Sequence, residues 1–195
     1  MTTFPTLHRT ARLLAATAAV GLLAIGCGDD GADDPGTAAP ITTPDSTPGE
    51  IEVVATDFAF DDLPAEITAG TRLTLRNDAA SELHELVAFA LPDDETRPAA
   101  ELMALPPDEL GAILGAAPPE LVVLAAPGGE PVTAVGDGTL DEPGRYLVIC
   151  AIPTGVDPDE YIAAAAESGD EPPEIPGGPP HLVHGMWAEV SVVES

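Results

Sequence analysis

The last third of the chain contains two strand-like segments that bracket an unusual group of side chains. Residues 144–150, GRYLVIC, form a short apolar run that ends in Cys150, and residues 186–193, MWAEVSVV, alternate between two faces. Both patterns are typical of β-strands. The second strand is preceded or begun by three further side chains of interest, His181, His184 and Met186. One strand therefore delivers a thiol, and the other follows two imidazoles and a thioether.

The region from residue 51 onward shows further short strands separated by turn residues. Strand patterns occur within residues 51–60, 65–77, 83–91 and 120–126, with Pro, Gly, Asn and Asp between them. Residues 51–60 alternate over part of their length, and Asp61-Asp62 with Pro64 break this strand pattern. Short strands at this spacing predict an all-β fold, either a sandwich or a barrel.

Two segments do not fit the strand pattern. Residues 96–117 are rich in helix formers, and Asp108-Glu109 follow two prolines as they would at a helix start. In the same segment Leu110, Ile113 and Leu114 share one helical face, which predicts one or two short helices. A further short helix is expected at residues 161–167, YIAAAAE.

The N-terminal region is expected to direct the protein out of the cytoplasm. Residues 1–26 combine a positive start with an apolar segment too short to span a bilayer, as a signal peptide does. The sequence LLAIGC that ends at Cys27 resembles the lipobox of bacterial lipoproteins, which implies cleavage before Cys27 and its attachment to a membrane lipid. Residues 28–50 are too polar and too rich in Pro to fold, so residues 27–50 are interpreted as a lipidated tether and residues 51–195 as the folded domain.

Charge excludes several classes of partner. The formal net charge is -28 and the chain contains no lysine. Nucleic acid is not an expected partner, because phosphate binding needs a basic surface. Electrostatic adhesion to anionic lipid is excluded for the same reason. We expect a monomer that contacts the membrane only through Cys27, with a redox partner that the sequence does not name.

The soft and borderline donors near the end of the chain favour copper. Cys150 is a lone thiol if Cys27 is lipidated, and such a thiol outside the cytoplasm is either a liability or a ligand. Two histidines and a cysteine with a weak axial methionine form the trigonal copper site of electron-transfer proteins. Far upstream, His84 in SELHELVAFAL supplies a further histidine on a strand.

These motifs resemble those of the cupredoxins, the plastocyanin and azurin family. Residues 144–155 resemble the cysteine strand and loop, residues 181–186 resemble the His-x₄-Met ending, and His84 resembles the upstream histidine. The resemblance implies a Greek-key β-sandwich and one type 1 copper, ligated by His84, Cys150 and His181 with Met186 as the axial group. It also implies one-electron transfer between Cu(II) and Cu(I). One departure is the long excursion between Cys150 and His181, interpreted as an insertion near residues 156–179, beside a second near residues 92–119.

Several alternatives remain open at the level of sequence. His184 competes with His181, because on an extended chain it would face the same way as Met186; the x₄ spacing and the preceding Pro179-Pro180 favour His181. Each residue alone has an ordinary structural explanation, such as core packing for Cys150. A copper carrier without electron transfer and a metal-free interaction module are therefore alternatives to the redox function. An enzyme is not expected, because a saturated copper offers no open position to a substrate.

Overall fold

The computed structural model describes residues 48–168 and 172–194. The expected signal peptide (1–26), the lipidation site Cys27 and residues 28–47 of the expected tether lie outside the described residues. Among the residues that are described, no helix has the length and apolar character needed to cross a bilayer.

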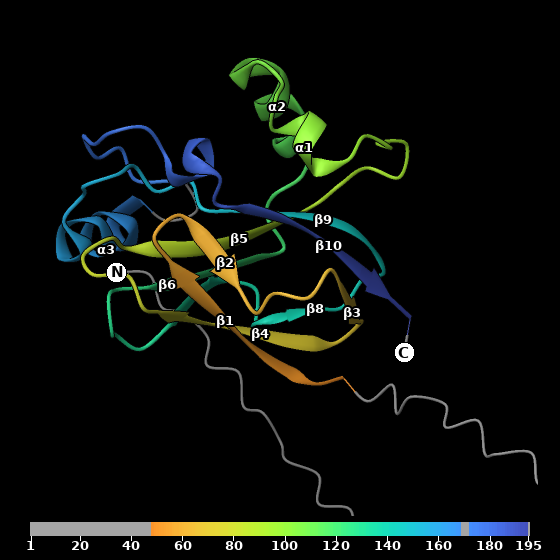
Figure 1. Ribbon diagram of the computed structural model, residues 1–195, viewed down its shortest axis with the longest axis horizontal. Coiled ribbons are helices and arrows are strands. Elements are labelled where there is room, and N and C mark those ends of the chain that lie inside the picture. Colours follow the sequence, from red (N-terminus) through yellow and green to blue (C-terminus); the bar gives the residue numbers. More distant parts are fainter. Residues whose placement is uncertain (1–47, 169–171, 195) are drawn as a thin grey trace, which may run out of the picture. The chain divides into compact units, whose positions relative to one another are not determined.

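The described chain folds into two β-sheets (Figure 1). The first sheet has the strand order β2 (Ala59–Asp61), β1 (Glu50–Thr56), β4 (Thr71–Asn77) and β8 (Thr139–Leu140). The second has the order β3 (Glu66–Thr68), β10 (Trp187–Val193), β9 (Gly144–Ile149), β5 (His84–Ala90), β6 (Leu121–Ala125) and β7 (Val132–Val135). Strands β5, β9 and β10 are neighbours although long segments separate them in the chain. These crossovers give a Greek-key β-sandwich and confirm the predicted fold class.

The main core lies between the two sheets. On β4 the exposed and buried side chains alternate, so that Leu73 and Leu75 point into the core, as the sequence pattern predicts. They meet side chains of the other sheet, including Leu86 and Val148, in one buried cluster. Burying such aliphatic side chains contributes about 1.5–3 kcal/mol each, and a core built mainly of Leu, Val and Ala therefore stabilises a domain that has few aromatic residues.

The second sheet is covered on both faces. Successive residues of β9 alternate between two clusters: Tyr146 and Val148 face the other sheet, whereas Leu147 and Ile149 face outward. The outward cluster is completed by two short helices, α1 (Ala99–Leu102) and α2 (Pro107–Leu114). This double coverage explains why GRYLVIC reads as a continuous apolar run rather than as an alternating one.

One strand ends earlier than its sequence pattern indicates. The pattern in residues 51–60 predicts a strand that continues to Phe60, but β1 ends at Thr56 and the chain turns back into β2. Phe58 lies in this turn with a positive φ of 63°. That conformation is uncommon for a bulky residue and carries backbone strain. The turn points an aromatic side chain toward the end of the sandwich where the candidate donors lie, as described below.

The excursion between Cys150 and His181 leaves the sandwich and returns to it at one place, here called its base, where residues 153–154 lie beside residues 179–180. It contains α3 (Pro158–Ser168) and leads into the 3₁₀ turn η1 (His181–His184). At the base, Pro153 pairs with Pro180, and the N–H of Thr154 donates to the carbonyl of Pro179 at 3.1 Å. Val156 and Tyr161 of the excursion are buried in the same cluster as Cys150. The excursion is therefore packed against the end of the core that carries the cysteine.

Candidate metal centre

The pairing of β5 with β9 places His84 beside Cys150. The two strands are antiparallel neighbours, so the beginning of β5 lies next to the end of β9. His84 is the first residue of β5, and Cys150 directly follows the last residue of β9. The N–H of Glu85 points at the sulfur of Cys150, with 3.4 Å between nitrogen and sulfur. Both side chains are completely buried.

His181 reaches the same place from a loop that backbone hydrogen bonds hold. Its N–H donates to the carbonyl of Ile152 at 3.0 Å, and the next N–H, of Leu182, donates to the carbonyl of Cys150 at 2.8 Å. Gly185 then reverses the chain with a φ of 105°, a conformation that favours glycine. The loop is thus fixed to the cysteine segment on both sides of His181.

Three donor atoms converge at the buried end of the sandwich. The Nδ1 atoms of His84 and His181 lie 3.1 Å apart, and the sulfur of Cys150 lies 3.3 Å from Nδ1 of His181 and 3.9 Å from Nδ1 of His84. Within the described residues, these three form the group of His, Cys, Asp or Glu side chains that could hold a metal. Bonds from a first-row metal to nitrogen and sulfur are about 2.0–2.3 Å long. One ion could therefore reach all three atoms, so the donor set fits a single metal.

Burial determines the protonation of the donors. Removal from water lowers the pKa of His84 to about 4, and a similar effect lowers that of His181. Both imidazoles are therefore neutral near pH 7, which is the form that binds a metal. Burial raises the pKa of the Cys150 thiol to about 12, with a further contribution from Glu85. A metal must displace the thiol proton to gain the sulfur as a ligand.

The histidine alternatives occupy opposite environments. His181 is completely buried, whereas His184 is exposed and its ring lies 4.8 Å from the ring of Phe58. The extended chain on which His184 would face the same way as Met186 is not formed, because residues 181–184 form a 3₁₀ turn. The structure brings together His84, Cys150 and His181, and leaves His184 outside that group.

Backbone hydrogen bonds connect Met186 to two residues of the donor group, Cys150 and His181. The side chain of Met186 is completely buried in the cluster that contains Cys150. Its carbonyl accepts the N–H of Cys150 at 3.1 Å, and its N–H donates to the carbonyl of His181 at 3.2 Å. A His₂Cys set with a neighbouring methionine is the ligand arrangement of a type 1 copper site. The fold and the donor set are cupredoxin-like.

Comparisons with solved structures find auracyanins and a haem-copper terminal oxidase, at low overall similarity. A reduced auracyanin from Roseiflexus castenholzii is 21% identical with a TM-score of 0.40, and the match covers 75% of this chain and 98% of that one. Auracyanin A from Chloroflexus aurantiacus, described as a blue copper protein, is 25% identical with a TM-score of 0.32 over 55% of this chain and 90% of that one. A haem-copper terminal oxidase matches at 15% identity and a TM-score of 0.35, over 82% and 76% of the two chains.

No family model and no curated protein sequence matches this chain. The cupredoxin-like description therefore depends on the chain's own strand order and on the convergence of its donors. That His84, Cys150, His181 and Met186 bind copper remains a prediction from the sequence, with which this geometry agrees.

Sequence reasoning missed three residues that surround the donors. Phe58 packs edge-on against His181, with ring centroids 5.0 Å apart. Glu82 places a carboxylate oxygen 3.3 Å from Nε2 of His181. Glu85 is buried and accepts the N–H of Ala151 at 3.0 Å, which ties the histidine strand to the residue after Cys150. The one signal in the sequence was that two glutamates flank His84 in SELHEL.

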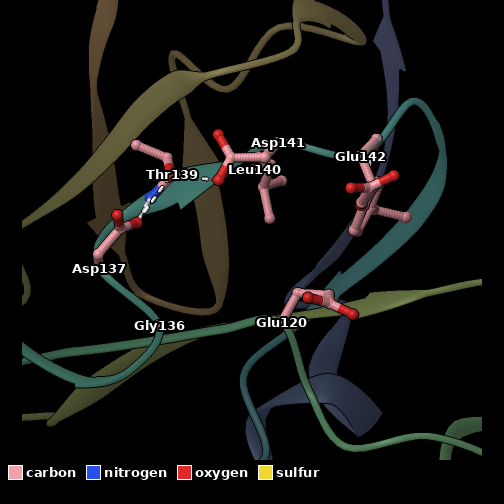
Figure 2. A pocket seen from close by; sticks show the side chains of 8 residues that line it. Glu120, Gly136, Asp137, Thr139, Leu140, Asp141 and Glu142 are labelled. Atoms are coloured by element: carbon pink, nitrogen blue, oxygen red, sulfur yellow. Dashed lines mark hydrogen bonds between the residues drawn. The ribbon is translucent and has the colours of Figure 1, made fainter.

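Two cavities of the described domain are lined by other residues. One cavity of about 450 Å³ has four acidic residues, among them Glu120, Asp137 and Asp141, in its lining (Figure 2). There Asp137 accepts hydrogen bonds from both the N–H and the hydroxyl of Thr139. An apolar groove of about 840 Å³ runs between the α1–α2 segment and residues 180–187. Neither is lined by His84, Cys150 or His181, so both are separate from the donor group.

Proposed function

We propose that this protein is an extracytoplasmic blue copper protein that passes single electrons to or from a redox partner. The observation that carries the proposal is the convergence of two imidazole Nδ1 atoms and one thiol sulfur, from three buried residues, within 3.9 Å of one another. Together with the thioether of Met186, this group would suit both oxidation states of copper, because two imidazoles favour Cu(II) while a thiolate and a thioether favour Cu(I).

The protein's own contribution is to hold these donors in place. His84 and Cys150 belong to paired strands, and His181 lies in a loop with hydrogen bonds to the cysteine segment. Bound copper would supply a one-electron couple between Cu(II) and Cu(I). A site that the fold has already formed leaves little room for rearrangement when the charge changes, which favours rapid electron transfer. Burial also keeps water away from the donors.

Direct electrochemistry tests this function. The copper-loaded protein should show one reversible one-electron wave, and its two oxidation states should give nearly the same circular dichroism in the protein region. His84→Ala should abolish the wave, while His184→Ala should retain it, since His184 lies outside the donor group. An irreversible wave, or loss of copper after each reduction, would contradict electron transfer.

The second candidate function is that of a copper carrier. A carrier would bind copper as an electron-transfer protein does, but it would pass on the metal ion rather than an electron. A carrier must give up Cu(I) to an acceptor, whereas the full burial of His84, Cys150 and His181 favours retention. Incubation of the Cu(I) protein with a competing Cu(I)-binding peptide separates the two. An electron-transfer protein should retain its metal over many turnovers, and release within seconds would favour the carrier.

We further propose that Cys27 anchors the protein to the outer face of the cytoplasmic membrane. The proposal is supported by the lipobox-like sequence LLAIGC and by the polar stretch that follows it. Mass spectrometry of the protein from membranes should find an N-terminal Cys27 that carries a diacylglycerol. Cys27→Ala should prevent this modification, and an unmodified Cys27 in membrane-bound wild-type protein would contradict it.

A further inference from the structure

The imidazole of His181 has a different neighbour at each ring nitrogen. Its Nδ1 faces the other donors, at 3.1 Å from Nδ1 of His84 and 3.3 Å from the sulfur of Cys150. Its Nε2 lies 3.3 Å from Oε2 of Glu82. The side chain of His181 has no exposed surface and that of Glu82 is 20% exposed, so water competes little for this contact.

His84 provides an internal contrast. Within the described part of the chain, its Nε2 is buried and has no hydrogen-bond partner. The two histidines thus present Nδ1 to the same point, but only His181 meets a carboxylate at the opposite ring nitrogen. If the contact between Glu82 and His181 were incidental, Glu82 would not need other interactions to hold it in place.

Glu82 is, however, fixed at both its backbone and its carboxylate. The buried side chain of Asn77 donates to the carbonyl of Glu82 at 2.8 Å and to the carbonyl of Ala125 at 2.8 Å. The carboxylate also accepts the N–H of Gly155 at 3.0 Å, through the same oxygen that faces His181. Gly155 belongs to the base of the excursion. Glu82 therefore connects three separate parts of the chain, through Asn77, Gly155 and the candidate ligand His181.

We propose that Glu82 is a positioning residue for the metal centre, which accepts the Nε2 proton of His181 and so directs the lone pair of Nδ1 toward the other donors. A neutral imidazole carries one proton, and the hydrogen bond at one nitrogen determines which nitrogen remains free. Carboxylates commonly orient metal-binding histidines in this way, and their removal typically costs about 10–100-fold in metal affinity. The inference depends on the proposed function only where copper is the ligand.

The histidine tautomer can be measured without any metal. In the copper-free, ¹⁵N-labelled full-length protein, the nitrogen shifts and couplings of the His181 ring report which nitrogen carries the proton. We expect the proton on Nε2 throughout the sample. A wild-type His181 that carries its proton on Nδ1 would overturn the proposal directly, even if every variant failed to fold.

Two substitutions separate hydrogen bonding from packing. Glu82→Gln keeps an oxygen that can accept the Nε2 proton, whereas Glu82→Leu keeps similar bulk without an acceptor. We expect the first to retain the Nε2–H tautomer and the second to lose its predominance. The matched control is Glu130→Leu, which makes the same chemical change at an exposed glutamate. An unchanged tautomer in folded Glu82→Leu protein would overturn the proposal.

Copper binding gives an independent second readout. With the metal alone as probe, competition against a chelator should show about 10–100-fold weaker binding to Glu82→Leu, and binding close to that of the wild type for Glu82→Gln and Glu130→Leu. Equal affinities for Glu82→Leu and the wild type would contradict the positioning role. If the wild type bound no copper but the tautomer changed as expected, the proposed function would fail and the role of Glu82 would stand.

Discussion

Nδ1 of His84 lies 3.1 Å from Nδ1 of His181, although 97 positions of sequence separate the two residues. Their approach depends on the pairing of β5 with β9 and on the hydrogen bonds that hold residues 181–186 to the end of β9. The contact between two buried neutral imidazoles compensates little of the free energy that each loses when it is removed from water. A metal between them and the thiol of Cys150 would satisfy all three donors together.

Loading of the site should release a proton. Burial raises the pKa of Cys150 to about 12, so the metal-free thiol is protonated throughout the neutral range. The two histidines are already neutral there and contribute no proton, because burial lowers their pKa values. Anaerobic titration with Cu(I) at constant pH should therefore release about one proton per ion between about pH 7 and 9.

The same titration of Cys150→Ser provides the control for proton release. Serine offers no thiol proton, so the variant should release none at this position. Loss of about one proton per ion from both proteins would mean that the proton comes from another group, and it would count against thiolate ligation.

The buried carboxyl of Glu85 should make stability depend on pH. Burial raises its pKa from 4.5 to about 7, so folding favours the protonated form. This contribution is fully present below about pH 4.5 and is lost as the pH rises through about 7, at a cost of up to about 3 kcal/mol. Urea unfolding of the copper-free protein should show this decline. Glu85→Gln should flatten it and the exposed Glu130→Gln should not; equal slopes for wild type and Glu85→Gln would contradict the prediction.

Phe58 should shield the histidine ligand. Its ring packs edge-on against His181 at 5.0 Å between centroids, and the strained turn that holds it there costs free energy. Phe58→Ala should allow a soluble chelator to remove copper several-fold faster, as followed by absorbance. Phe60→Ala in the same hairpin is the comparison, since Phe60 packs against the main core. Identical extraction rates in the two variants would show that Phe58 is not a barrier.

The strand framework and the donor types could be predicted from sequence because both depend on local pattern. Cys150 ends a short apolar run in the sequence and His84 begins another. In the structure Cys150 directly follows β9 and His84 is the first residue of β5. His184 was harder to exclude, because its direction depends on a 3₁₀ turn that the Pro-rich context does not reveal. The packing of α1 over β9 could not be predicted either, since the sequence of an amphipathic helix does not show which sheet the helix will contact.

The surroundings of His181 could not be predicted for a related reason. Glu82 and Phe58 reach His181 from distant parts of the chain. Neither contact leaves a periodic signal in the sequence, and the pattern around Phe58 even favoured a continuous strand. Contacts of this kind depend on the assembled fold.

The covering helices should be an integral part of the domain. Leu102 of α1 is completely buried against the outer face of the second sheet. Leu102→Ala should therefore lower the free energy of unfolding by about 2–5 kcal/mol. Val132, which is 56% exposed, serves as the control, and Val132→Ala should change stability by less than about 0.5 kcal/mol. Equal losses in urea unfolding would mean that α1 packs loosely.

The central claim is that His84, Cys150 and His181 bind one copper ion through two imidazoles and a thiolate. The most direct measurement is the optical and electron paramagnetic resonance spectrum of the protein after addition of Cu(II), beside Cys150→Ser and His84→Ala. We predict an intense visible thiolate-to-copper band with a narrow copper hyperfine splitting, lost in both variants and retained in His184→Ala. A colourless protein that takes up no copper would contradict the claim.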